Sequence, residues 1–279
     1  MRLAPDDWRE REREHADRAA ALTAEHVARR RRGEKHPVWD FLFTYYSYKP
    51  AALTRWHPGA GVELEGAADT DRAAWRWYAP GAADRSLRID ADAYESDKRS
   101  VVRLARIMLR RTSERPGQFD CFGLHEWAMV YRQGEHRHPQ PLRLGQRTTD
   151  EVVEAHDLRC THFDAFRFFT PDAVPRNRQP LTVDERAANE QPGCLHAGMD
   201  VYKWAMKLGP LVPGHLLLDA FELARDIRLL DMQAAPYDLS DFGVVPVPIE
   251  TAAGKAEYVR RQREFAERGG ALRRAILAA

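Results

Sequence analysis

The spacing of apolar residues along the chain predicts a mainly helical protein. Between Leu216 and Leu230, apolar side chains recur every three or four positions, which is the period of one face of an α-helix and predicts a helix over residues 214–233. Similar spacing predicts the other helices, which are expected over residues 6–32, 90–111, 122–131, 193–207 and 257–277. Two shorter helices are expected, one within residues 36–50 and one beginning at residues 148–151, where threonine and acidic side chains suit a helix start.

A small β component interrupts the helical pattern. Residues 75–79 and 86–90 alternate between apolar and polar side chains, and Pro80-Gly81 lies between them. This period of two predicts a short hairpin. Residues 245–249 contain two prolines, which suit an edge strand or a docking arm better than a central strand.

These patterns predict the fold class, a mainly α protein with a small β component (α+β). No internal repeat and no convincing linker divides the sequence. We therefore expect a single compact helical domain over residues 1–279 with a short hairpin. A charged N-terminal helix is expected within residues 1–32, and a charged C-terminal helix within residues 255–279. The long irregular segment of residues 171–192 is typical of a lid or binding loop.

Composition limits the class of protein. The chain has 44% hydrophobic and 10% aromatic residues, which is typical of a folded globular protein. Its 43 basic and 42 acidic residues give a net charge of +1, so net charge offers no sign of affinity for nucleic acid or membranes. The basic cluster of residues 29–32 is interpreted as a solvated helix end rather than a phosphate-contacting patch.

The cysteine count and the absence of long apolar runs suggest a compartment. Three cysteines without a CxxC pair favour a reducing cytosol and argue against a zinc ribbon. The polar N-terminus does not resemble a signal peptide, and no apolar run approaches the roughly 20 residues that a membrane span needs. We expect a cytoplasmic protein with no membrane partner, and the sequence leaves the oligomeric state open.

Three motifs combine an imidazole with a carboxylate in the middle of the chain. They are His125-Glu126, His162-x-Asp164 and His196-x-x-x-Asp200. On a helix, the last spacing places both side chains on one face, with Lys203 one turn further along. The surrounding residues are apolar, so these polar groups are expected to be partly buried, where pKa shifts large enough for acid–base chemistry arise.

Two chemistries and one structural alternative fit these motifs. In the first, Asp164 or Asp200 is the general base or stabilises a cation, and the histidines and Arg167 orient a substrate. The residues expected to be catalytic are then Asp164, His162, Asp200, His196 and Arg167. In the second, His125, Glu126, His162 and His196 bind iron, manganese or zinc, with further carboxylates from Asp164, Asp200, Glu222 or Asp226, because imidazole and carboxylate suit such metals. In the third, each pair supports helix packing in a non-catalytic binding protein. No HExxH motif supports the metal interpretation.

Aromatic residues supply candidate substrate contacts. Six aromatic side chains lie between Trp39 and Tyr48, and a core helix is the simplest explanation. The alternative is that Tyr45, Tyr46 or Tyr48 presents a ring and a hydroxyl to a planar ligand such as a base. Phe166 and Lys203 are the other residues expected to contact substrate. The sequence contains no GxSxG, P-loop or GxGxxG motif, which argues against α/β-hydrolase, ATP and NAD chemistry.

Several of these stretches also resemble a known family. The stretches are residues 36–50, 121–131, 160–171, 193–204 and 224–239. They resemble an actinobacterial protein family commonly labelled 3-methyladenine DNA glycosylase, and the resemblance extends over residues 22–273. It implies an enzyme that acts on a nucleobase or nucleoside by hydrolysing the N-glycosidic bond of an alkylated purine.

The resemblance implies further roles for residues already singled out. In such a reaction, a flipped base would stack on aromatic side chains such as Tyr45 and Tyr46, and nucleic acid or a nucleobase would be the partner. A buried carboxylate, Asp164 or Asp200, would activate water or stabilise the oxocarbenium ion. The sequence does not decide whether the protein uses no cofactor or a transition metal.

Overall fold

The computed structural model describes residues 1–136 and 138–279. Helices predominate in this part of the chain, and four short strands form one sheet. The expected fold class, mainly α with a small β component, is therefore confirmed. None of the helices in the described residues is both long enough and apolar enough to cross a membrane.

The chain divides into two compact units, which are described separately below. Unit 1 comprises Met1–Leu109, Val201–Glu222 and Leu272–Ala279, and unit 2 comprises Arg110–Asp200 and Leu223–Ala271. The division falls inside four helices, which are α5 (Arg99–Ser113), α10 (Leu195–Leu208), α11 (Gly214–Gln233) and α12 (Ala252–Ala278). The single domain expected from the sequence stays a prediction.

Unit 1 contains the sheet, whose strand order is β1-β2-β4-β3. The strands are β1 (Arg2–Leu3), β2 (Glu63–Leu64), β3 (Tyr78–Pro80) and β4 (Leu87–Ile89). The antiparallel pair β3 and β4 confirms that a hairpin forms, but its first strand begins at Tyr78 rather than at residue 75 and includes Pro80, which was expected between the strands. Strand β1 pairs in parallel with β2, and β2 pairs antiparallel with β4. The sequence did not predict β1 or β2, because two residues are too few to show an alternating pattern.

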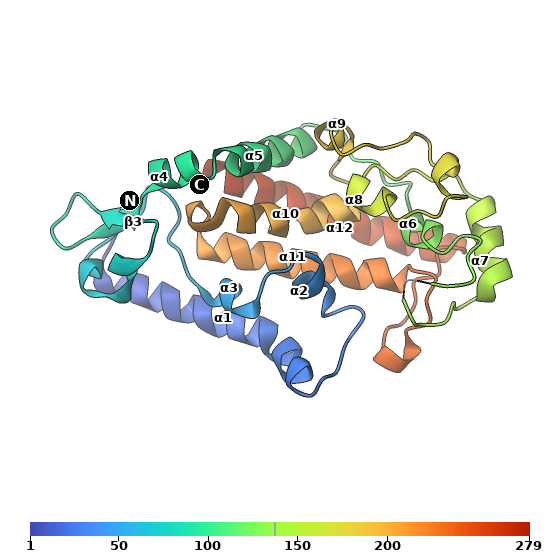
Figure 1. The fold of residues 1–279 in the computed structure, drawn as a ribbon, viewed down its shortest axis with the longest axis horizontal. Coiled ribbons are helices and arrows are strands. Elements are labelled where there is room, and N and C mark those ends of the chain that lie inside the picture. The colour runs from blue at the N-terminus through green and yellow to red at the C-terminus, as the bar shows by residue number, and fades with distance from the viewer. Residues whose placement is uncertain (137) are drawn as a thin grey trace. The chain divides into compact units, whose positions relative to one another are not determined.

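The N-terminal helix α1 (Pro5–Arg31) confirms the helix expected near residues 6–32. Proline at its first position and acidic side chains in its first turn suit a helix start. Gly33 follows its end with a φ of 73°, the left-handed conformation that glycine adopts readily after a helix. Helix α1 lies beside α3 (Pro50–Thr54) (Figure 1), and the imidazole of His15 contacts the carbonyl oxygen of Leu53 at 2.7 Å.

Two helices of unit 1 are shorter than expected. Within residues 36–49 only α2 (Phe41–Tyr45) is helical, and Ser47 follows it with a φ of 59°. The helix expected over residues 90–111 is divided at Lys98 into α4 (Ala91–Asp97) and α5. The remaining helical turns of this unit are of the 3-10 type, namely η1 (Ala67–Asp69), η2 (Asp71–Ala74) and η4 (Gly209–Leu211).

Unit 2 holds a set of short helices beside segments of long ones. The short elements are α6 (Leu124–Ala128), α7 (Gly145–Glu154), α8 (Phe163–Phe166), α9 (Arg186–Asn189), η3 (Val174–Arg176) and η5 (Ser240–Phe242). Residues 171–192 are mostly irregular, as expected. Helix α7 begins before the expected start at residues 148–151. Helix α12 begins five residues before the expected residue 257, and the hydroxyl of Thr251 accepts a hydrogen bond from the Gly254 N–H at its start.

Close packing within unit 2 brings polar side chains of different helices toward one core. A Cβ atom added to Gly198 on α10 would lie 2.6 Å from the Cδ1 atom of Ile227 on α11, so only glycine allows this approach without a shift of its neighbour. The indole N–H of Trp127 on α6 donates to the carbonyl oxygen of Ala234 at 2.8 Å. Both contacts fix elements that carry the polar residues described next.

Candidate metal centre

Two groups of buried histidines and carboxylates lie in unit 2. The first ligand group is His125, Glu126, His196 and Asp231, and the second ligand group is His162, Glu190 and Asp200. In each group, one nitrogen or oxygen atom from every residue lies within 4.8 Å of the others. Their side chains are nearly inaccessible, with exposed fractions between 0% and 7%. Buried charges on this scale need either partners or a metal ion.

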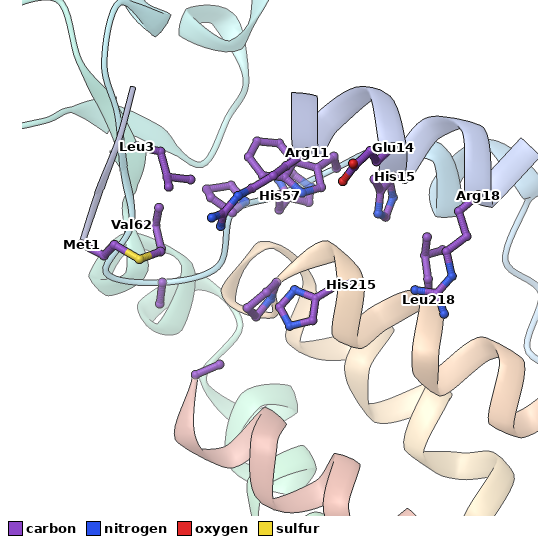
Figure 2. Close-up of a pocket in the computed structure, with 15 residues that line it drawn as sticks. Met1, Leu3, Arg11, Glu14, His15, Arg18, His57, Val62, His215 and Leu218 are labelled. Carbon is purple, nitrogen blue, oxygen red and sulfur yellow. The ribbon is translucent and has the colours of Figure 1, made fainter. Parts of the chain in front are cut away.

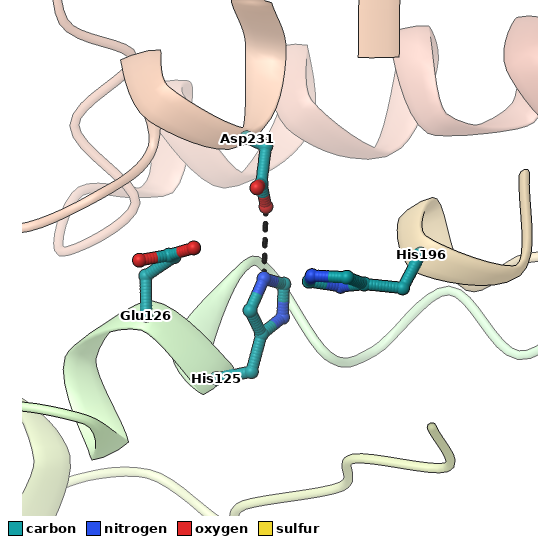
Figure 3. A group of neighbouring side chains, drawn as sticks. All are labelled: His125, Glu126, His196 and Asp231. Carbon is teal, nitrogen blue, oxygen red and sulfur yellow. Dashed lines mark hydrogen bonds and ion pairs between the residues drawn. The ribbon is translucent and has the colours of Figure 1, made fainter. Parts of the chain in front are cut away.

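The first ligand group draws its members from three helices, as Figure 3 shows. His125 and Glu126 are neighbours on α6, His196 lies in the first turn of α10, and Asp231 lies near the end of α11. The Nε2 atom of His125 lies 2.8 Å from the Oδ1 atom of Asp231. The ring of His196 meets the ring of His125 edge-on, with 4.5 Å between their centroids.

Arg228 holds both carboxylates of this group from one side. Its Nη1 atom donates to the Oδ2 atom of Asp231 at 2.8 Å and to the Oε1 atom of Glu126 at 3.4 Å. The guanidinium is itself buried. Arg228 thus fixes one oxygen of each carboxylate. Of the remaining two oxygens, the Oδ1 atom of Asp231 contacts His125, and the Oε2 atom of Glu126 has no hydrogen-bond partner among the described residues. Such outer contacts orient the side chains that bind metals in proteins.

Two potential ligand atoms of the first group have no hydrogen-bond partner in the described residues. They are the Oε2 atom of Glu126 and the Nδ1 atom of His196, and both are buried. Leaving a buried polar atom unsatisfied costs roughly 1–3 kcal/mol, and native proteins do so rarely. Other buried atoms of the described residues lack a partner as well, but these two belong to one cluster of side chains that can bind a metal ion.

The local charges keep the two imidazoles of the group in different states. Burial is the largest single influence on His125 and opposes its protonation, but the charge of Asp231 and the contacts of the ring with Asp231 and Cys121 together outweigh it and raise the pKa of His125 well above its usual value. Burial, reinforced by the charge of His125, lowers the pKa of His196 well below its usual value. Burial also raises the pKa of Glu126. His196 is therefore a neutral imidazole, the form that can offer a lone pair to a metal ion, whereas His125 would have to release a proton on binding one.

The second ligand group has a different geometry. The Nε2 atom of His162 faces two carboxylates, with the Oδ2 atom of Asp200 at 3.3 Å and the Oε1 atom of Glu190 at 3.6 Å. His162 precedes α8, Glu190 follows α9, and Asp200 lies on α10. The ring of His162 stacks on that of His196, with 5.3 Å between their centroids. The two ligand groups are therefore adjacent.

The backbone before α6 adopts an uncommon conformation that places His125 and Glu126. Phe122 and Gly123 have φ values of 49° and 73°, and the left-handed region is costly for a residue with a side chain. A Cβ atom on Gly123 would lie 3.3 Å from Ala234 and from the ring of Tyr258. This turn also delays the start of the helix expected over residues 122–131 to Leu124, because neither residue can be part of a right-handed helix in this conformation; the helix ends at Ala128.

The structure rearranges the pairs suggested by the sequence. His125 contacts Asp231 as well as lying beside Glu126, and His162 faces Asp200 and Glu190 rather than Asp164. The Oδ1 atom of Asp164 accepts a hydrogen bond from Arg186 at 2.7 Å and lies 3.6 Å from the Nε atom of Arg167. Asp164 is thus held in a local ion pair.

The other residues expected at a site lie as follows. Phe166 is buried in unit 2 against Phe169. Tyr45, Tyr46 and Lys203 belong to unit 1, where Tyr45 and Tyr46 contact each other edge-on and Lys203 lies over the ring of Trp204. The alternative carboxylates Glu222 and Asp226 pair with Arg18 and Arg268, respectively. The three cysteines are free thiols, and the Sγ atom of Cys121 lies 3.7 Å from the Nδ1 atom of His125.

Sequence reasoning missed Asp231, Arg228 and Glu190. The sequence did mark the first two as inward-facing. Arg228 lies four residues after Ala224, and Asp231 lies four residues after Ile227, so both fall on the apolar side of α11. A charged residue at an inward position of an amphipathic helix is a candidate for a site. Glu190 lies at the end of a four-residue helix, where no periodic pattern exists.

Unit 1 contains a separate cavity of about 400 Å³, shown in Figure 2. Its walls combine apolar side chains such as Leu3 and Val62 with polar ones such as Arg11, Glu14 and His57. The Nδ1 atom of His57 lies 3.1 Å from the hydroxyl oxygen of Tyr78. Burial, aided by the charge of Arg72, lowers the pKa of His57 to about 3.

Acidification should therefore destabilise the protein through His57. Below pH 6.5 the unfolded chain binds a proton at this residue, whereas the folded chain does not until the pH approaches about 3. The free energy of unfolding should fall as pH falls through this window, with His57 contributing a loss of about 2 kcal/mol between pH 7 and pH 5.

Chemical denaturation across this pH range measures the effect. His57→Gln should flatten the dependence of unfolding free energy on pH, whereas His215→Gln, at an exposed position of the same cavity, should leave it unchanged. Equal slopes in wild type and His57→Gln would refute the prediction.

Comparison with known proteins identified no relative from which a role for these residues could be inferred. The chain matches no protein-family model, no curated protein and no solved structure.

Proposed function

We propose that the protein is a metal-dependent enzyme whose first ligand group binds iron, manganese or zinc. The observation that carries this proposal is the pair of unsatisfied buried atoms, Glu126 Oε2 and His196 Nδ1, beside His125 and Asp231. A metal ion would satisfy both atoms. Imidazole and carboxylate together form a common ligand set for these three metals.

The spacing of the group supports this proposal. Two atoms bound at about 2.1 Å to one tetrahedral ion lie about 3.4 Å apart. The four ligand atoms lie within 4.8 Å of one another before any ion adjusts them. Arg228 restrains one oxygen of Glu126 and one of Asp231, which reduces the conformational freedom that metal binding would otherwise have to remove.

The chemistry proposed is that of an oxygenase or a hydrolase acting on a small molecule. A bound metal would polarise an oxygen atom of the substrate or lower the pKa of bound water. The chain itself contributes a nearly dry setting, because every member of the group is at least nine-tenths buried. In such a setting electrostatic interactions with a reacting group are stronger than in water.

Metal analysis of the protein purified without a histidine tag tests the proposal. Wild type should bind a stoichiometric ion, and Glu126→Gln and His196→Ala should each weaken binding by about 100-fold or more, because loss of a ligand should cost at least as much as loss of an outer contact. Elemental analysis and competition with a chelator of known affinity provide the measurement.

A matched control separates specific binding from adsorption to surface histidines. His215→Ala removes an exposed imidazole of unit 1 and should leave metal affinity unchanged. Wild-type protein that stays metal-free after exposure to Fe(II), Mn(II) and Zn(II) would rule the proposal out. Unchanged affinity in both ligand variants, with intact circular dichroism spectra, would do the same.

Hydrolysis of an N-glycosidic bond, the reaction implied by the resemblance, is the second candidate. The buried carboxylate of Asp200, 3.3 Å from the imidazole of His162, favours it, because such a carboxylate suits the activation of water. The assay is release of free base from alkylated DNA by protein treated with a chelator. Release that is lost on Asp200→Asn would favour this reaction, and no release from any alkylated substrate would exclude it.

A further inference from the structure

We infer that the second ligand group, His162, Glu190 and Asp200, binds a second metal ion, so that the protein contains a dinuclear centre. This inference rests on the proposed function, since the first ion would occupy the adjacent first ligand group. It adds to that proposal the residues that would bind a second ion, a free coordination position on that ion for water or substrate, and different roles for the two ions.

The contacts of His162 are better explained by coordination than by hydrogen bonding alone. Its Nε2 atom faces two carboxylate oxygens, at 3.3 Å and 3.6 Å. One N–H group has a single hydrogen, and good N–H···O bonds are about 2.7–3.2 Å long. The 3.3 Å contact with Asp200 is a long hydrogen bond, and the 3.6 Å contact with Glu190 is too long for one, so a single N–H group does not account for the approach of both carboxylates.

A metal ion accounts for the same separations. Ligand atoms bound at about 2.1 Å to a tetrahedral ion lie about 3.4 Å from one another, which falls between the two observed distances. All three side chains are at least 98% buried, so solvent does not explain why the three atoms converge. They come from three separate segments, just before α8, just after α9 and within α10, and helix periodicity therefore does not account for their meeting.

His196 connects the two ligand groups. Its ring contacts those of both His125 and His162, at centroid distances of 4.5 Å and 5.3 Å. Asp200 lies one helical turn after His196 on α10, so that helix supplies one ligand to each group. Two ions held this way would share a single buried compartment, which is the arrangement that two-metal enzymes use to act on one substrate.

The two groups would have different roles because they offer different numbers of ligands. The first ligand group provides four residues, which can fill a tetrahedral shell. The second provides three, and catalytic sites with three protein ligands keep a position for water or substrate. The ion in the second ligand group would therefore be the one that contacts the reacting oxygen of a small substrate.

Two measurements on the full-length protein test this inference: the number of metal ions bound per chain, and the electron paramagnetic resonance spectrum of bound Mn(II). Wild type loaded with Mn(II) should bind two ions per chain and give the broadened spectrum of two coupled ions. Glu190→Gln, a nearly isosteric change, should bind one ion and give the six-line spectrum of isolated Mn(II). Glu185→Gln, an exposed change at the opposite end of α9, should behave as wild type.

The outcomes separate this inference from the proposed function. One ion per chain in both wild type and Glu190→Gln would overturn the second site and leave the first intact. No ion in wild type would overturn the proposed function itself. If Glu190→Gln fails to fold, an isolated-ion spectrum in wild-type protein loaded to saturation would still overturn the inference.

Discussion

Replacing Arg228 with leucine should destabilise the metal-free protein by about 3–5 kcal/mol, because a buried ion pair that loses one partner leaves an uncompensated charge. Arg228 donates to both Asp231 and Glu126 in a setting where the exposed fractions of all three side chains are at most 5%. Leucine fills part of the volume but offers neither charge nor donor. Urea denaturation in the presence of a chelator measures the loss.

Arg260→Leu is the matched control for this variant. Arg260 also bridges two carboxylates, Glu257 and Glu264, on helix α12, but its side chain is 56% exposed. Exposed ion pairs contribute little to stability, so the unfolding free energy should not change within the error of the measurement. If both variants had equal stability, the buried network would not hold the two carboxylates as described.

The fold class was readable from the sequence because long helices repeat their pattern several times. Helix α11 confirms the range expected from apolar spacing over residues 214–233, and α1 matches its expected range within one residue at either end. Short elements were not readable in the same way. The two-residue strands β1 and β2, and the division of α4 from α5 at Lys98, involve too few residues for a period to appear.

The candidate site was predictable by residue type but not by partner. The sequence suggested metal ligation by His125, Glu126, His162 and His196, and the structure brings each of them into a ligand group. Sequence neighbours were nevertheless a poor guide to pairing. The carboxylate of Asp231 reaches His125 across 106 positions, and that of Asp200 reaches His162 across 38. Such contacts depend on how helices pack, which local spacing does not determine.

Arg72 is the second position where a single substitution should have a large effect. Its guanidinium is buried among four aromatic rings, with its central carbon 4.6–5.7 Å from their centroids. It also donates to the hydroxyl oxygen of Tyr78 at 2.9 Å, to the carbonyl oxygen of Trp56 at 3.2 Å, and to the carboxylate of Glu12. Arg72→Ala removes all of these interactions and leaves a cavity, so we expect a loss of about 3–5 kcal/mol.

Arg72→Lys tests whether charge alone explains this effect. Lysine keeps the positive charge but lacks the planar, forked donor group that contacts three acceptors and stacks on aromatic faces, so it should still lose about 2–3 kcal/mol. Arg76→Ala is the control, because Arg76 lies over the ring of Trp77 and pairs with Asp97 but is 67% exposed. Chemical denaturation should rank stability as wild type and Arg76→Ala highest, Arg72→Lys next and Arg72→Ala lowest. Wild-type stability in Arg72→Lys would mean that the charge is sufficient and that the fork geometry of the guanidinium contributes nothing to the packing of unit 1.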